Sequence, residues 1–385
     1  MALDPAEVHA ALDGYPTTPT VAAVGSHSAL DIADGAAAEG LPTLVLAQTG
    51  REATYARYYR TLRDGSGRRR RGCVDEVWTY PRFADLATPT EQDRLRKRGA
   101  VLVPNRAFSS YVPLDAIEER FRVPIFGSRA MLRIEERTER DNYYTLLEQA
   151  GVPTPKRLDG PGAIERLAIV KLPHATRRLE RGFFTVASPQ EYREKSARLL
   201  AQGTIREADL TAARLEEYVL GPVFNFNFFF SPLAPRADGL ELLGVDERRE
   251  SDLDGLVRLP ADQQLALPAS ARLPQYTVVG HGTLTVRESI LEEVFGLAER
   301  FVEASRSRYP PGIIGPFCLQ SCLDRDGHPV VFDVAVRIGG GTNVHLGVGH
   351  PYGNALWRTP MSSGRRVAVE LRRASETGRL AEVVT

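Results

Sequence analysis

The 385-residue chain has little of what marks a secreted, membrane or nucleic-acid-binding protein. Its three cysteines (Cys73, Cys318 and Cys322) cannot form a disulfide framework and favour a reducing compartment. No apolar run reaches the roughly 20 residues that span a bilayer, and the N-terminus lacks a basic segment followed by an apolar one. The 49 Lys and Arg residues balance the 49 Asp and Glu residues, which disfavours bulk electrostatic binding of nucleic acid. We therefore expect a cytoplasmic protein with neither a membrane nor a nucleic-acid partner.

The first 125 residues alternate between short apolar runs and helical stretches. This alternation predicts a parallel sheet with right-handed crossovers. Ligands of such sheets bind beyond the carboxyl ends of the strands, so we expect Gly25–Ser28, Gly50–Arg51 and Asn105–Arg106 along one edge. The strands are predicted at Thr20–Gly25, Leu41–Ala47, Cys73–Pro81 and Ala100–Asn105. The arginine run in Gly65–Gly72 lies between glycines and is predicted to be a solvated loop.

The rest of the chain has a mixed α+β pattern. Helices are expected over residues 127–151, 188–203 and 289–305 and from about Ser363. Strands are expected on both sides of a loop within residues 167–188, and over residues 214–233, 240–251, 253–261 and 313–343. The predicted division is a first domain of residues 1–125 and a second of residues 126–385, with parts 126–230 and 231–385.

Several polar residues of this second region form a set suited to phosphoryl transfer. Lys171 precedes the loop and can neutralise nucleotide phosphates. Gln320 and Asp333 offer oxygen ligands for Mg²⁺, and Arg337 can stabilise the charge that develops during transfer. Each residue alone is a weak signal, and Asp333 with Arg337 can equally be a structural ion pair. Their order along the chain makes nucleotide-dependent chemistry the favoured interpretation.

The segment Phe224–Phe230 alternates Phe and Asn, which places the two residue types on opposite faces of a strand. We expect Phe224, Phe226, Phe228 and Phe230 to be core. Asn227 lies on the other face, where its amide can both donate and accept and so orient a substrate amide or formate.

The chain resembles the archaeal-type, formate-dependent synthetases of 5-formaminoimidazole-4-carboxamide ribonucleotide (FAICAR), which belong to the ATP-grasp superfamily. The resemblance covers nearly the whole chain and includes VAAVGSHSALDIADGAAAEG, VLVPNRAF, VPIFGSRAMLR, EEYVLGPVFNFNFFFSPL, PGIIGPFCLQS and GGGTN. It implies an N-terminal Rossmann-like sheet, the pre-ATP-grasp domain, followed by an ATP-grasp fold. It also implies ligation of formate to the aminoimidazole carboxamide ribonucleotide (AICAR) through formyl phosphate, with ATP, Mg²⁺ or Mn²⁺, and a homotrimer or homohexamer.

The resemblance also implies roles for individual residues. Arg337 and Asn343 would lie beside the transferred phosphoryl group, and Gln320 and Asp333 would hold the metal. The implied ATP-binding residues are Lys171, Arg181, Gly182, Glu216, Glu217, Tyr218 and Val219. The implied substrate-side residues are His27, Ser28, Gly50, Arg51, Arg129 and Arg258, the last as a partner for formate or a phosphate.

The chain departs from the family pattern at several of these positions. Its lid, PHATRRLERGFF, keeps only Gly182 of the usual glycines, and Asp333 replaces a glutamate. Thr145 replaces a lysine, and Ala107 replaces a serine that can contact substrate phosphate. His345 and His350 are additional and have no assigned role. Three functions therefore stay open: a formate–AICAR ligase, an ATP-grasp ligase for another acid and amine, and a nucleotide-binding module without catalysis.

Overall fold

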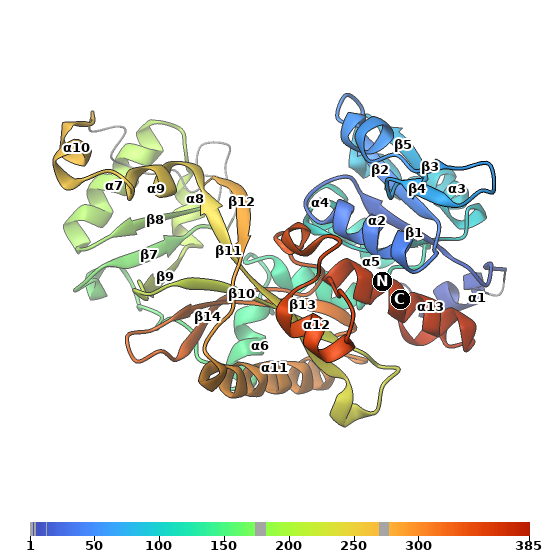
Figure 1. The fold of residues 1–385 in the computed structure, drawn as a ribbon. Helices are drawn as coiled ribbons and strands as arrows, with labels where there is room; N and C mark the ends of the chain where they lie inside the picture. The colour runs from blue at the N-terminus through green and yellow to red at the C-terminus, as the bar shows by residue number, and fades with distance from the viewer. Residues whose placement is uncertain (1–2, 4, 13, 174–181, 269–276) are drawn as a thin grey trace.

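The computed structural model describes residues 3, 5–12, 14–173, 182–268 and 277–385 (Figure 1). The predicted lid, His174–Arg181, lies outside the described residues, and with it the predicted ATP contact of Arg181. None of the described helices combines the length and apolar character required to cross a membrane.

The N-terminal sheet is parallel, as predicted, with strand order β5-β2-β1-β6. Its strands are Thr20–Val24 (β1), Thr43–Gln48 (β2), Glu76–Tyr80 (β5) and Ala100–Leu102 (β6). The order reverses at β1, where β2 pairs on one side and β6 on the other. The crevice between the carboxyl ends of β1 and β6 is therefore the expected ligand position of this sheet.

The two loops at this crevice are tied together by Asn105. Its side-chain amide donates to the backbone oxygens of Val24 (2.8 Å) and Ser26 (3.1 Å). The same side chain accepts from the N–H of Phe108 and so caps helix α4 (Arg106–Tyr111). The segment with His27 is thus held beside the segment with Arg106.

The end of the chain returns to the N-terminal unit. Helix α13 (Ser363–Glu376) packs against α2 (Ala29–Ala38), and both contribute to one apolar cluster with β1 and β2. A Cβ at Gly35 would lie 2.4 Å from the backbone of Gly364, so the close approach of the two helices requires glycine. Thr385 then pairs with Ile125 through two backbone hydrogen bonds. The predicted domain boundary at residue 125 assigns this C-terminal segment to the second domain, although it packs against the first.

The central sheet is antiparallel, with strand order β12-β11-β10-β13-β14. Its strands are Val223–Phe230 (β10), Leu240–Glu250 (β11), Val278–Thr283 (β12), Gly315–Leu323 (β13) and Pro329–Ala335 (β14). One face is covered by α6 (Tyr143–Gln149) and α11 (Glu288–Arg308), and their shared apolar cluster contains Phe226, Phe228 and Phe230. The opposite face carries Asn225 and Asn227, so the predicted alternation is confirmed.

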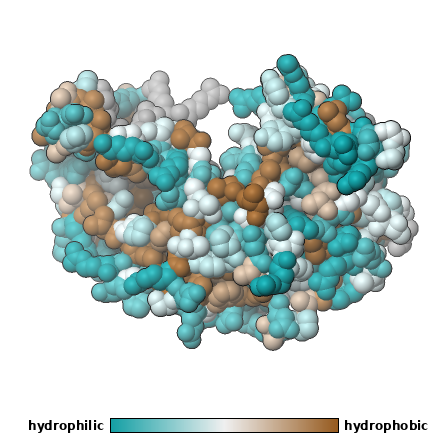
Figure 2. Space-filling view, in the orientation of Figure 1, coloured by the Kyte–Doolittle hydropathy of each residue, from teal (hydrophilic) through white to brown (hydrophobic). Residues whose placement is uncertain are grey.

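A smaller antiparallel sheet, β8-β7-β9, lies beside the central sheet (Figure 1). It consists of Ala168–Lys171 (β7), Phe183–Val186 (β8) and Arg214–Glu217 (β9), with α7 (Pro189–Ala201) packed against it. Figure 2 shows the molecular surface hollowed between this part, on the left, and the N-terminal unit, on the right.

The structure differs from the predicted elements in three places. Residues 127–151 form a 3₁₀ helix (η3, Arg129–Glu135) and then α6, because Asn142 caps a new helix through the N–H of Tyr144. Residues 253–261 are not a strand, because the Asp254 carboxylate accepts from the N–H of Glu250 and turns the chain into a short helix. The arginine run of residues 65–72 forms part of a small exposed hairpin.

The remaining elements are short. The helices are Pro5–Leu12 (α1), Pro89–Lys97 (α3), Leu114–Glu119 (α5), Glu207–Thr211 (α8), Ser251–Leu256 (α9), Ala261–Ala266 (α10) and Pro351–Trp357 (α12), with a π-helical turn at Thr54–Tyr58 (η1). The 3₁₀ turns are Phe83–Ala87 (η2), Pro161–Ala163 (η4), Arg236–Asp238 (η5), Thr342–His345 (η6) and Leu380–Glu382 (η7). The hairpin strands are Leu62–Arg63 (β3) and Arg69–Arg71 (β4).

Candidate active site

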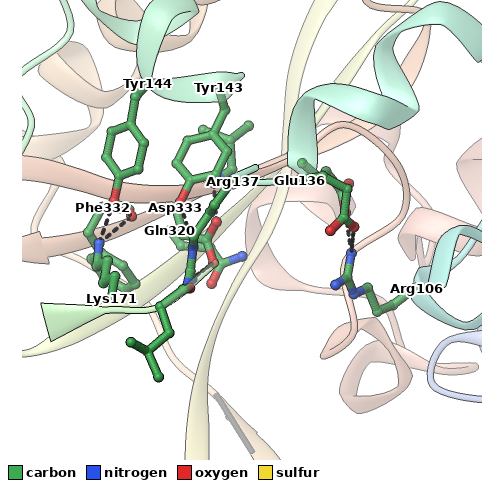
Figure 3. A network of polar contacts seen from close by, with 12 residues as sticks. Arg106, Glu136, Arg137, Tyr143, Tyr144, Lys171, Gln320, Phe332 and Asp333 are labelled. Carbon is green, nitrogen blue, oxygen red and sulfur yellow. Dashed lines mark hydrogen bonds and ion pairs between the residues drawn. The ribbon is translucent and has the colours of Figure 1, made fainter. Parts of the chain in front are cut away.

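Lys171 lies at the end of β7, with its ammonium directed at the central sheet (Figure 3). Its Nζ donates to the Tyr144 hydroxyl (2.6 Å) and to the Phe332 backbone oxygen (3.1 Å). It also forms an ion pair with Glu216 Oε2 at 2.6 Å. Burial is the largest influence on this group and lowers the pKa of Lys171, while Glu216 opposes it. The three N–H donors of the ammonium therefore already have three partners.

Gln320 and Asp333 pair directly across β13 and β14, as the metal prediction requires. Gln320 is in turn the register partner of Asn225 on β10, which is the register partner of Asp246 on β11. Residues paired in this way lie on the same face of a sheet. The four polar side chains thus form one row across the sheet, on the face opposite α11.

The oxygen atoms of this row suit a hard cation. Asp333 has an exposed side-chain fraction of 27%, and its Oδ2 lies 4.0 Å from Arg137 Nη2. Gln320 Oε1 accepts from the guanidinium of Arg248. No cluster of three His, Cys, Asp or Glu side chains able to hold a metal occurs within the described ranges. The residues fit Mg²⁺ nevertheless, because this ion is usually held by one or two protein oxygens together with water and substrate phosphates.

Arg337 follows β14 and is buried beside the N-terminal unit. Its Nη2 forms an ion pair with Glu135 Oε2 at 3.0 Å, and its Nη1 donates to the Ile338 oxygen at 2.8 Å. Glu135 also pairs with Arg106 at 3.4 Å, so residues of both units meet at this carboxylate. A small cavity here is lined from both units, by residues that include Val103, Pro104, Gly127, Ser128, Arg337 and Ile338.

His27 occupies the crevice at the end of β1. Its φ angle of 44° is in the left-handed region, and its Nδ1 lies 2.8 Å from the Ser26 hydroxyl. Burial, followed by the positive charges of Arg337 and Arg106, lowers the pKa of His27. The imidazole is thus favoured in its neutral form, next to two cations that suit a phosphate.

A glycine segment, Gly339–Gly341, passes between the units. A Cβ at Gly340 would lie 3.3 Å from His27 Cδ2. A Cβ at Gly341 would lie 2.2 Å from Asp246 Oδ2 and 2.7 Å from His281 Cδ2. Glycine is therefore needed in this segment, because a Cβ would come too close to His27, Asp246 or His281.

Asp246 is fully buried below this segment. Its carboxylate accepts from the side-chain amides of Asn225 (2.7 Å) and Asn227 (2.6 Å). Burial raises the pKa of Asp246 to about 6, and the two amides oppose the rise. Because the Asn227 amide nitrogen is engaged in this way, Asn227 presents an acceptor to a ligand more readily than a donor.

Several predicted substrate residues lie away from this centre. The buried guanidinium of Arg129 donates to four backbone oxygens, those of Ile117, Phe121, Val123 and Thr385. These bonds use Arg129 to join the ends of the N-terminal unit, in place of the predicted contact with substrate. Arg258 is exposed after α9, on the segment whose predicted strand is a helix. Gly50 and Arg51 are exposed beyond β2.

Other predicted site residues are engaged within the protein. The Ser28 hydroxyl is buried and donates to the Gly339 oxygen. The Asn343 amide donates to the His27 oxygen (2.5 Å) and accepts from the Asp31 N–H (3.1 Å). Gly182 accepts from the Leu172 N–H at 2.6 Å.

The predicted adenine linker begins at Glu217, the last residue of β9, and continues through Tyr218 and Val219. The Glu217 side chain pairs with Arg166 at 2.7 Å. The Tyr218 N–H donates to the Leu167 oxygen at 3.0 Å, and the Val219 oxygen accepts from Cys322 Sγ at 3.5 Å. The segment thus runs between the small sheet and β13.

Sequence reasoning missed Arg137, Glu135, Arg248, Asp246 and His281 as neighbours of the site. Asp246 and Arg248 alternate along one strand, which is the only sequence signal that marks them. The additional histidines have structural positions. Burial lowers the pKa of His345 to about 3, and His350 Nδ1 accepts from the Tyr352 N–H to cap α12.

Two family models and several relatives match the chain over most of its length. Residues 21–158 match the family "Protein of unknown function (DUF1246)", and residues 191–385 match "Domain of unknown function (DUF1297)". The chain is similar to the 5-formaminoimidazole-4-carboxamide-1-(beta)-D-ribofuranosyl 5'-monophosphate synthetases of Methanopyrus kandleri and Methanothermobacter thermautotrophicus. The identity is 41% over 95% of both chains for the first, and 39% over 97% of both chains for the second.

Solved structures resemble the fold over most of the chain. The IMP biosynthesis protein PurP from Thermococcus kodakaraensis is 30% identical, with a TM-score of 0.69 over 95% of this chain and 100% of the other. An N5-carboxyaminoimidazole ribonucleotide synthetase in complex with ADP is 11% identical, with a TM-score of 0.59 over 90% and 79% of the two chains. The fold is that of an ATP-grasp ligase. Within this class, the chain belongs to the FAICAR synthetase family.

Proposed function

We propose that the protein joins formate to the 5-amino group of AICAR, with cleavage of ATP to ADP and phosphate. The observation that carries the proposal is that Lys171, Asp333 and Arg337 lie on one side of the central sheet, with Arg337 near His27. Lys171 donates to the backbone oxygen of Phe332, the residue before Asp333 in β14. Arg337 shares the Glu135 carboxylate with Arg106, which follows the crevice of the N-terminal sheet. The family membership supports the choice of substrates.

The first chemical step activates formate. A formate oxygen attacks the γ-phosphorus of ATP, which gives formyl phosphate and releases ADP. Arg337 is proposed to stabilise the charge of the transferred phosphoryl group. A magnesium or manganese ion would supply charge neutralisation of the phosphates and would be held by Gln320 and Asp333.

The second step forms the amide. The amine nitrogen attacks the formyl carbon, the bond from this carbon to the phosphate oxygen breaks, and the nitrogen loses a proton. His27 is proposed to hold the ribonucleotide at the crevice of the N-terminal sheet, beside Arg106. The proposed lid, His174–Arg181, would exclude water from the hydrolysis-prone intermediate. Glu217, Tyr218 and Val219 are proposed to contact adenine.

A phosphate-release assay tests this proposal. ATP and magnesium are held constant, while formate and AICAR are added singly and together. Release that requires both substrates supports the formate–AICAR ligase. Release that appears only when another carboxylate or another amine replaces formate or AICAR selects the second candidate, which the altered lid sequence and Ala107 keep open. No release from any mixture overturns both and leaves a nucleotide-binding module.

We further propose a cytoplasmic homo-oligomer, a trimer or hexamer, on the basis of the family resemblance. Light scattering of the purified chain measures this directly, and a monomeric mass contradicts it.

A further inference from the structure

We infer that Arg137 is a phosphate-binding residue of this site and contacts the phosphate chain of the bound nucleotide. The inference rests on the proposed function, because it requires that the site takes a nucleotide. Arg137 lies between η3 and α6 and points toward Lys171 and Asp333 (Figure 3). The predicted set of site residues does not include it.

Lys171 alone is poorly prepared to bind phosphate. Its side chain is only 5% exposed, and its three donors are directed at Glu216, Tyr144 and the Phe332 oxygen. An ammonium has no further N–H to offer. A phosphate could bind Lys171 only if one of these short contacts were released.

Arg137 has the opposite character. A guanidinium has five N–H donors, and among the described residues those of Arg137 make only long contacts. Nε lies 3.3 Å from the Tyr143 hydroxyl, Nη1 lies 3.5 Å from the Leu172 oxygen, and Nη2 lies 4.0 Å from Asp333. The side chain is 24% exposed. Its donors are therefore available, and the fork of a guanidinium matches phosphate oxygens.

The distribution of charge supports the same role. The buried Glu216 is neutralised twice, by Lys171 and by Arg214. Asp333 has a single cation at ion-pair distance in the described part of the chain, namely Arg137. A phosphate chain brought next to Asp333 adds negative charge, and Arg137 is the group placed to neutralise it.

Calorimetric titrations of nucleotide, with magnesium and without formate or AICAR, test the inference. The variants are Arg137→Ala and Arg137→Lys, and the matched control is Arg140→Ala, an exposed arginine of the same segment. Arg137→Ala is expected to weaken ATP and ADP binding by about 10- to 100-fold. Binding of AMP is expected to change much less, because AMP lacks the β- and γ-phosphates and so offers Arg137 fewer phosphate oxygens to contact. Arg137→Lys should restore part of the affinity, and the control should match the wild type.

Four outcomes overturn the inference. Equal weakening of ATP, ADP and AMP assigns Arg137 a structural role through Tyr143 and Leu172. Unchanged ATP affinity in a folded Arg137→Ala variant removes Arg137 from the phosphate site. If Arg137→Ala does not fold, the test uses the ratio of ATP affinity to AMP affinity in Arg137→Lys. A ratio equal to that of the wild type contradicts the phosphate-binding role of Arg137. A wild-type chain that binds no nucleotide overturns the proposed function as well, which separates the two failures.

Discussion

The side-chain amide of Asn343 donates to the backbone oxygen of His27 at 2.5 Å, across 316 positions of sequence. The same amide accepts from the N–H of Asp31 at the start of α2. The loop after β14 is thereby fixed to the crevice of the N-terminal sheet. This contact aligns the proposed binding site for the ribonucleotide with the proposed site for phosphoryl transfer.

His27→Ala is expected to raise the KM for AICAR by about tenfold or more, because it removes a side chain at the proposed ribonucleotide site. ATP affinity should stay within about twofold of the wild type, since the proposed phosphate contacts Lys171 and Arg137 lie on β7 and before α6, outside the crevice of the N-terminal sheet. Steady-state kinetics and ATP titrations check both values. His9→Ala, in α1, is the control. A loss of ATP affinity with an unchanged KM for AICAR would place His27 elsewhere.

Much of the fold was predictable because local patterns and tertiary structure agree. The strand positions of the N-terminal sheet and the alternation in Phe224–Phe230 follow from periodicity alone. Residues 253–261 were mispredicted because their apolar residues fit a strand or a helix. The side chain of Asp254, which closes a turn on Glu250, decided the outcome.

A site residue was predictable only where its side-chain chemistry suggests a role and the fold also brings it to the site. Asp333 and Gln320 carry a recognisable chemistry, and the sheet register brings them together. Arg129 shows the limit of this reasoning, because its charge suggests a ligand, yet four backbone carbonyls use its donors. Arg137 was missed for a complementary reason, since nothing local marks a helix-flanking arginine as facing β14.

Asp333→Asn is expected to abolish phosphate release while the fold is kept. The change removes the negative charge proposed to hold the metal, and its side chain is partly exposed, so folding depends little on it. Turnover should fall by at least about 100-fold, with a melting temperature close to that of the wild type. Asp326→Asn, in the exposed turn before β14, is the control. Wild-type turnover at saturating magnesium would refute the assignment.

Arg129→Ala is expected to reduce stability and to leave substrate affinity unchanged. Removal of the guanidinium leaves several buried carbonyls without a donor, which costs on the order of 2–4 kcal/mol in the free energy of unfolding. Urea unfolding measures the change, and the exposed Arg120 provides a control substitution, Arg120→Ala. A raised KM for AICAR at wild-type stability would restore the substrate contact predicted from the sequence.

Asp246→Asn is expected to stabilise the protein at neutral pH. The pKa of this carboxyl rises from 3.8 to about 6 on folding because of burial. The stabilising contribution of the protonated Asp246 carboxyl is therefore complete below pH 4 and is lost as the pH rises through about 6. The variant should gain on the order of 1–3 kcal/mol at pH 7 and show a flatter stability profile between pH 4 and 6. Unfolding curves across this range decide, with the exposed Asp262→Asn as control. A loss of stability at pH 7 would contradict the prediction.

Gly341→Ala is expected to disrupt the junction between the two units. The added Cβ would lie 2.2 Å from Asp246 Oδ2 and 2.7 Å from His281 Cδ2, and the buried carboxylate is held by Asn225 and Asn227. The glycine segment must then move away, which also displaces Arg337 and Asn343 on either side. We expect turnover to fall by about 100-fold or more and the KM for AICAR to rise. Gly280→Ala, on β12 with open space at its Cβ, is the matched control and should retain activity. Equal activity of the two variants would show that the segment tolerates a side chain and that its contact with Asp246 is not required.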